Sequence, residues 1–147
     1  MRPKFATSPD VSPARYSLLL LVGAVEDKDA VFSQFPWHTR TARCFREALP
    51  LICRDLARVV LCEGAPYDGS WKDVLELAAS RPYPPPLIVT SRLADERLWA
   101  EVLNLGGYDV LAQPLDRAEA LRAIRLAWDH WESHDECELR AVGAPAK

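Results

Sequence analysis

The chain has 147 residues, of which 49% are hydrophobic, and a formal net charge of −3. This length suits one domain with a single core. The balanced charge, without a basic stripe, argues against direct nucleic-acid binding. Its apolar runs are too short to cross a membrane, and its 4 cysteines lack the close pairs typical of zinc sites. We therefore expect a cytoplasmic protein with reduced thiols and no metal site.

The first half of the chain alternates apolar runs with amphipathic segments. Residues 1–15, rich in proline and polar residues, predict a flexible N-terminal tail. The pattern that follows predicts a buried strand, a helix with acidic residues in its first turn, a short edge strand, a second helix and a second buried strand. These elements span 16–22, 26–35, 39–42, 45–56 and 58–62 respectively.

The second half repeats this alternation. After a turn-forming loop, we expect a helix over 70–79, a strand over 87–90, a helix over 95–105, a strand over 108–112 and a last helix that begins after Asp116. Gly106 and Gly107 are expected to end the helix over 95–105. The domain is thus expected to span 16–134, with a C-terminal tail over 135–147.

Strands that alternate with helices indicate an α/β fold. Five such strands predict a parallel sheet with helices on both faces, joined by right-handed crossovers. In these folds ligands and chemistry are found at the carboxyl ends of the strands. Four segments follow strands and are therefore candidates for a site: 23–27, 62–69, 90–92 and 112–114.

Residues 85–115 contain a strand, a hydroxyl pair, an amphipathic helix, a second strand and the step Gln113-Pro114. This order resembles the second half of a bacterial response-regulator receiver domain, and the resemblance extends over about residues 16–131. It implies a flavodoxin-like sheet with strand order 2-1-3-4-5. It also implies that Pro114 follows a peptide bond that is often cis in the family.

The resemblance assigns family positions to residues of this chain. Glu63 stands where the family has its phosphoacceptor aspartate, and Ser91 stands where a Ser or Thr bonds the phosphoryl group. Gln113 replaces the lysine that pairs with the phosphorylated aspartate. Gly23 and Ala24 replace the acidic pair that helps to hold magnesium.

These replacements predict that the ordinary phosphorylation fails. Phosphoryl transfer depends on positioning and on charge neutralisation by a metal and a cation. Magnesium prefers an oxygen shell with one or two carboxylates, which Gly23 and Ala24 cannot supply, so we expect weak or absent Mg²⁺ binding and no other cofactor. Glu63 has two interpretations that the sequence leaves open: a permanent charge that imitates the phosphorylated state, or a solvated loop residue.

The leading hypothesis is a stand-alone, degenerate receiver domain. It would act in signal transduction by binding a protein, such as a histidine kinase or another signalling protein, or a second copy of itself, and it would not be an enzyme. The candidate interface lies on the later helices and includes Trp99, Arg122 and Leu126.

The sequence also allows two alternatives. An active but atypical receiver would use Glu26 and Asp27 in place of the acidic pair, with Asp68 as a substitute acceptor. A small α/β enzyme or ligand-binding domain would instead use Cys62, Glu63 and Ser91 in the same crevice.

Overall fold

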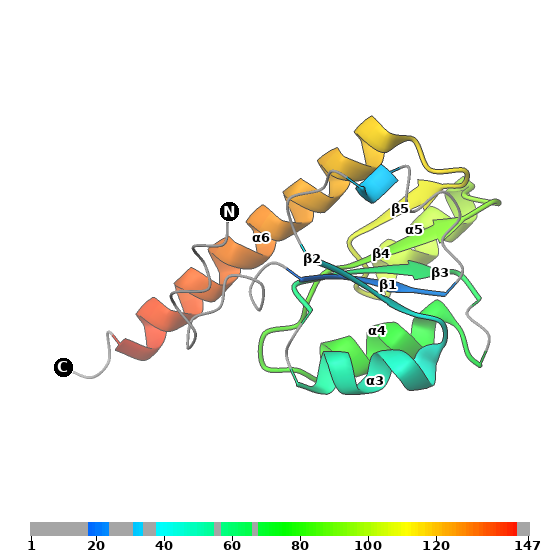
Figure 1. Cartoon of the computed structure of the whole chain (residues 1–147). Coiled ribbons are helices and arrows are strands. Elements are labelled where there is room, and N and C mark those ends of the chain that lie inside the picture. The colour runs from blue at the N-terminus through cyan, green and yellow to red at the C-terminus, as the bar shows by residue number, and fades with distance from the viewer. Residues whose placement is uncertain (1–17, 24–30, 34–37, 55–56, 66–67, 144–147) are drawn as a thin grey trace.

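A computed structural model describes residues 18–23, 31–33, 38–54, 57–65 and 68–143. Its strands form one five-stranded parallel sheet in the order β2-β1-β3-β4-β5 (Figure 1). This architecture confirms the predicted fold class and strand order. The strands are β1 (Leu18–Val22), β2 (His38–Ala42), β3 (Val59–Glu63), β4 (Leu87–Ser91) and β5 (Asp109–Ala112).

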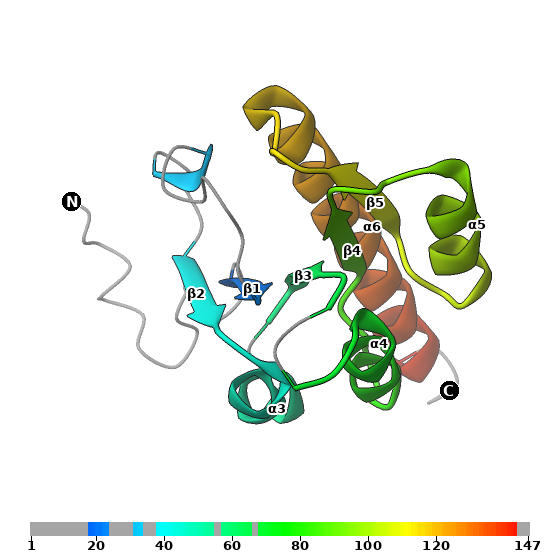
Figure 2. The ribbon, with the colours of Figure 1, turned by 90° about the vertical axis from the view of Figure 1, so that its right-hand side faces the viewer.

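Helices cover both faces of this sheet. On one face lie α3 (Phe45–Cys53) and α4 (Trp71–Ala79), and α6 (Arg117–Gly143) crosses the other face (Figures 1 and 2). The remaining helix, α5 (Glu96–Asn104), lies beside β5 and directs its buried Val102 into the core on the side of α3 and α4.

The core is divided by the alternation of side chains along each strand. Successive residues of a strand point to opposite faces of a sheet, and both faces are buried here, as in parallel sheets generally. The residues that pack with α3 and α4 include Leu20, Val22, Val60, Cys62 and Val89. Those that pack with α6 include Leu19, Leu21, Val59, Leu61 and Ile88.

The sequence signals at the helix ends are confirmed. Ser70 accepts a hydrogen bond from the backbone N–H of Lys72 at 3.1 Å, and the carboxylate of Asp73 accepts one from the N–H of Ser70 at 2.9 Å. These reciprocal bonds satisfy N–H groups that have no partner within the helix. The carboxylates of Asp95 and Asp116 each accept one hydrogen bond, from the backbone N–H groups of Leu98 and Glu119, and so cap α5 and α6.

The last helix is longer than expected. It continues to Gly143, through most of the segment predicted to be a tail. Five of the nine residues over 135–143 are glutamate, leucine, arginine or alanine, which are good helix formers, and the next proline is Pro145. In Figure 1 the helix extends well past the sheet. The helix-forming composition, rather than the sheet beneath it, therefore accounts for its length.

One apolar residue of α3 is more exposed than its spacing suggests, and two predicted segments lie outside the described residues. Leu49 has the helical spacing of an apolar face with Phe45 and Ile52, yet it is 40% exposed because the buried face of α3 is centred on Ala48, Leu51 and Ile52. The predicted N-terminal tail lies outside the described residues, as does most of the helix predicted over 26–35. In the part of the chain that the structure describes, no helix is both long and apolar enough to span a membrane.

The packing of α6 generates a prediction about stability. Ile124 is fully buried against the sheet, so Ile124→Ala should lower the free energy of unfolding by about 2–5 kcal/mol. Leu126→Ala on the same helix is the control, because Leu126 is 52% exposed and its truncation leaves no cavity. Urea titration of both variants checks this. Equal losses would contradict the packing described for α6.

Candidate functional site

The carboxyl edge of the sheet gathers the residues that the sequence singled out. Glu63 and Ser91 are the last residues of β3 and β4, while Gly23 and Gln113 directly follow β1 and β5. Figure 2 views the molecule from this end. Because the strands are parallel, these residues lie along the same edge.

Gly23 and Glu63 are in close contact at the centre of the edge. Gly23 has φ of +93°, and a Cβ placed on it would lie 2.7 Å from Glu63 Oε1 and 2.8 Å from Glu63 Cβ. Its N–H donates to the carbonyl of Ala42 at 2.8 Å, which fixes it beside β2. The side chain of Glu63 therefore fills the space that a side chain at position 23 would need, and only glycine fits there.

The hydroxyl group that contacts Gln113 is that of Thr90. Gln113 Nε2 donates to Thr90 Oγ1 at 2.9 Å, and Thr90 is fully buried. Thr90 is also the register partner of Glu63, so these two side chains share a face of the sheet. The peptide bond between Gln113 and Pro114 is cis, as the resemblance implies.

Ser91, which the resemblance placed at the hydroxyl position, belongs to the opposite face. Its Oγ accepts from the N–H of Leu93 at 3.0 Å and so shapes the turn after β4. Ser91 precedes Gln113 by 22 residues, whereas Thr90 precedes it by 23. The resemblance therefore assigns the hydroxyl position to Ser91, whereas the residue that contacts Gln113 is its neighbour Thr90. The register of β3 with β4 distinguishes the two.

Asp68 caps the amino end of α3. Its two carboxylate oxygens accept from the backbone N–H groups of Phe45 at 2.6 Å and Arg46 at 3.1 Å. Desolvation raises the pKa of Asp68, but these hydrogen bonds together outweigh it and lower the pKa below its usual value. Because Cys44, the N-cap residue, forms no side-chain cap, Asp68 replaces it from a distant loop.

Magnesium does not fit the described part of this edge. Gly23 offers no side-chain ligand, and the space beside it is filled by Glu63. Across the described residues, no three His, Cys, Asp or Glu side chains come together as a metal site. Ala24, Glu26 and Asp27 lie outside the described residues.

Cys62 and Glu63 lie on different faces, so the structure does not join them with Ser91 in one crevice. Cys62 is fully buried with the residues beneath α3 and α4. Its Sγ donates to the carbonyl of Glu63 at 3.1 Å. Burial, and then the nearby carboxylate of Glu63, raise the pKa of the Cys62 thiol far above its usual value. The thiol is thus protonated at neutral pH and is a poor nucleophile.

The candidate interface residues lie on the surface. Trp99 on α5 is 50% exposed, and Leu126 on α6 is 52% exposed. Arg122, one turn before Leu126, is also exposed. These side chains are available for contacts with a partner.

Comparison with known proteins agrees with this geometry. No family model and no curated protein matches the sequence. Solved structures do match, among them the signal receiver domain of an HD domain-containing protein from Pseudomonas fluorescens Pf-5, with 26% identity, a TM-score of 0.72 and coverage of 83% of this chain and 93% of that one.

Two further matches have lower identity. A CheY-like response-regulator receiver domain protein from Methanospirillum hungatei JF-1 has 17% identity and a TM-score of 0.69, covering 80% of this chain and 98% of that one. The beryllofluoride-activated NtrC4 receiver domain dimer has 19% identity and a TM-score of 0.69, covering 78% and 98%. The sheet and its crossovers define a doubly wound α/β protein. Within that class, the chain has the fold of response-regulator receiver domains, as its sequence predicts.

The contact between Gly23 and Glu63 predicts a coupled pair. Gly23→Ala should lower the free energy of unfolding by about 1–3 kcal/mol, because alanine is strained at this φ and its Cβ meets the Glu63 side chain. Gly64→Ala is the control, since its Cβ would meet only Thr90 O, at 3.8 Å.

A double-mutant cycle separates strain from contact. In the presence of Glu63→Gly, the cost of Gly23→Ala should fall, because the two atoms that the new Cβ would meet most closely, Oε1 and Cβ of Glu63, are both removed. Thermal or urea unfolding of the four proteins measures this coupling. Strict additivity would show that the two side chains do not compete for the same space.

Proposed function

We propose that this chain is a degenerate receiver domain that signals by binding another protein and takes no phosphoryl group. The observation that supports this most directly is the close contact of Glu63 with Gly23. The position that the resemblance gives to the phosphoacceptor is packed against the position that it gives to a magnesium-binding acid.

The contact between Thr90 and Gln113 supports the same proposal. In the receiver family, a hydroxyl and a lysine bind the phosphoryl oxygens. Here the Gln113 amide is neutral and already donates to Thr90. It therefore supplies none of the positive charge that a transferred phosphoryl group requires.

Glu63 gives this edge a permanent carboxylate. A phosphorylated receiver gains charge only when it is modified, whereas this charge belongs to the side chain itself. We therefore propose a module that stays in one signalling state. Its output is controlled by the binding of a partner and not by phosphorylation.

The proposed partner is a cytoplasmic signalling protein, such as a histidine kinase, or a second copy of this chain. Exposed Trp99 and Leu126 support such a surface, since exposed aromatic and aliphatic side chains serve as anchors of interfaces. The NtrC4 receiver, which is similar in fold, is a dimer. By analogy, the proposed homodimer uses the surface of α5 and α6.

The atypical receiver and the enzyme have less support. Asp68, the substitute acceptor, uses both carboxylate oxygens at the start of α3. Phosphorylation there would disturb that cap. The enzyme would need Cys62 as a reactive thiol, and its burial disfavours the thiolate.

The lost reaction has a direct test. Incubation with acetyl phosphate and magnesium should leave the intact mass of the protein unchanged, because the described edge offers no fitting metal site and no neutralising lysine. An established receiver treated in parallel shows that the reagent is active. A stoichiometric phosphoryl adduct that disappears in Asp68→Asn would overturn the proposal in favour of the atypical receiver.

Self-association has a separate test. Trp99→Ala should raise the dissociation constant of the dimer about tenfold or more, because an aromatic anchor is lost from the interface. Leu49→Ala is the control for truncation of an apolar surface residue elsewhere, because Leu49 on α3 is 40% exposed. Sedimentation equilibrium gives the dissociation constants of the unmodified chain and of the two variants. If the unmodified chain is monomeric at about 50 µM, a concentration in the micromolar range typical of weak complexes, the homodimer is rejected and a different partner protein remains.

A further inference from the structure

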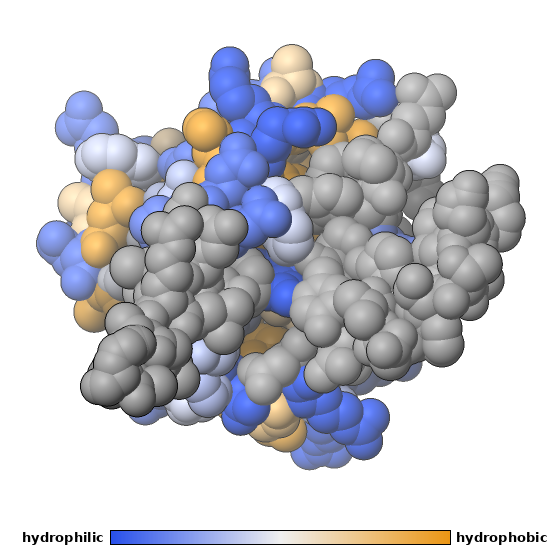
Figure 3. All heavy atoms as spheres, turned by 90° about the vertical axis from the view of Figure 1, so that its left-hand side faces the viewer, coloured by the Kyte–Doolittle hydropathy of each residue, from blue (hydrophilic) through white to orange (hydrophobic). Residues whose placement is uncertain are grey.

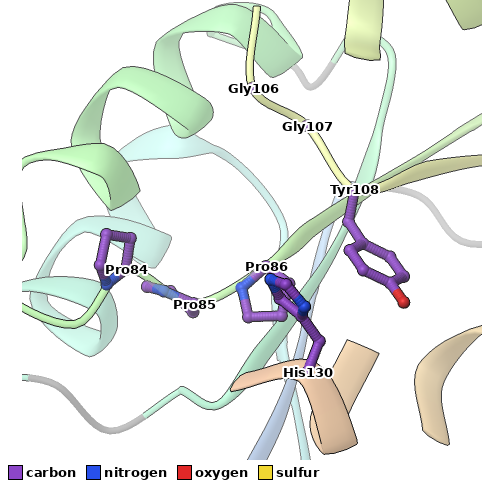
Figure 4. A pocket seen from close by; sticks show the side chains of 7 residues that line it. All are labelled: Pro84, Pro85, Pro86, Gly106, Gly107, Tyr108 and His130. Atoms are coloured by element: carbon purple, nitrogen blue, oxygen red, sulfur yellow. The ribbon is translucent and has the colours of Figure 1, made fainter. Parts of the chain in front are cut away.

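A cavity of about 300 Å³ lies at the amino-terminal end of the sheet, away from Glu63. Its walls come from three places in the chain: the segment before β4, the segment between α5 and β5, and α6 (Figure 4). The lining residues are Pro84, Pro85, Pro86, Gly106, Gly107, Tyr108 and His130. This volume is at the lower end of the range for small-molecule sites.

The walls are rigid and mainly flat. Three successive prolines have fixed φ angles and present ring surfaces. On the far side, Tyr108 and His130 lie with their ring centroids 5.7 Å apart and their planes inclined at 44°. Gly107 lies close to Val102 of α5 and donates its N–H to the Val102 carbonyl at 2.8 Å, which holds this segment against the helix. A preformed site of this kind favours a flat ligand, since little ordering is needed on binding.

The backbone of the cavity wall has few donors to offer. Prolines have no N–H, and the N–H groups of Gly106, Gly107 and Tyr108 donate to carbonyls of Leu103, Val102 and Leu87. A phosphate group or an extended peptide is usually held by backbone N–H groups. The remaining polar groups of the lining side chains are the Tyr108 hydroxyl and the His130 imidazole, which suit a small ring with one polar substituent.

The aromatic lining distinguishes cations from anions. Tyr108 and His130 present their rings at the cavity. The face of an aromatic ring attracts a cation and does not attract an anion.

Figure 3 views this end of the molecule. Among the described residues that are visible there, hydrophilic colour predominates and hydrophobic colour forms separate groups.

We propose that this cavity binds a small aromatic amine, held between the prolines and the Tyr108–His130 pair. The site is at the opposite end of the sheet from Glu63. The proposal does not depend on the signalling role, and either one can fail without the other.

Titration of the full ¹⁵N-labelled chain with tryptamine, indole and indole-3-acetate tests both the shape and the charge of the site. Tryptamine should produce saturable shifts of the Gly106, Gly107 and Tyr108 amide signals, with a dissociation constant of about 1 mM or below, as expected for a ligand of this size. Indole should bind more weakly, and indole-3-acetate should bind at least about fivefold more weakly than tryptamine.

Paired histidine variants test the location. His130→Ala should weaken tryptamine binding about fivefold, because an aromatic wall is lost. His38→Ala, an exposed histidine on β2, should leave it unchanged. Unfolding curves of both variants verify that they remain folded. The proposal is overturned if no probe gives saturable shifts, if indole-3-acetate binds as well as tryptamine, or if His130→Ala binds like the unmodified chain.

Discussion

The alternation of side chains along parallel strands, with both faces buried, is the constraint on which this structure depends. Leu21, Leu61 and Ile88 pack beneath α6, and their immediate neighbours pack beneath α3 and α4. A shift of one residue would exchange the two sets. The same alternation continues to the carboxyl edge, where it decides that Glu63 faces the same way as Thr90.

At that edge, the Glu63 side chain has room because Gly23 has no side chain. Glutamate is longer than aspartate by one methylene group, and its carboxylate needs space. Gly23 provides this space by having no Cβ and by adopting a positive φ. An acid placed at position 23 would conflict with the Glu63 side chain, so a metal ligand at that position would require changes at both residues.

Much of the fold could be predicted because its signals are local. Apolar runs mark the strands, and Ser70, Asp95 and Asp116 mark the beginnings of helices within three residues of their partners. The order of elements before Pro114 was enough to indicate the receiver fold. Such signals need no knowledge of how distant segments meet.

The parts that were missed depend on contacts between distant residues. Thr90 and Ser91 are both hydroxyl residues at the end of an apolar strand, and only the register of β4 with β3 shows which one faces Glu63. The cap that Asp68 supplies to α3 joins residues 22 and 23 positions apart. Likewise, the cavity at the amino end combines three segments that are far apart along the chain.

The two ends of the sheet differ in the space that they offer a ligand. Doubly wound folds bind ligands at the carboxyl ends of their strands, but here Glu63 lies against Gly23 and Gln113 engages Thr90. A cavity is instead present at the amino end. His130 on its wall and Leu126 on the proposed interface are four residues apart on α6, so they lie on the same side of that helix. A ligand in the cavity would therefore sit beside the surface at which a partner is proposed to bind.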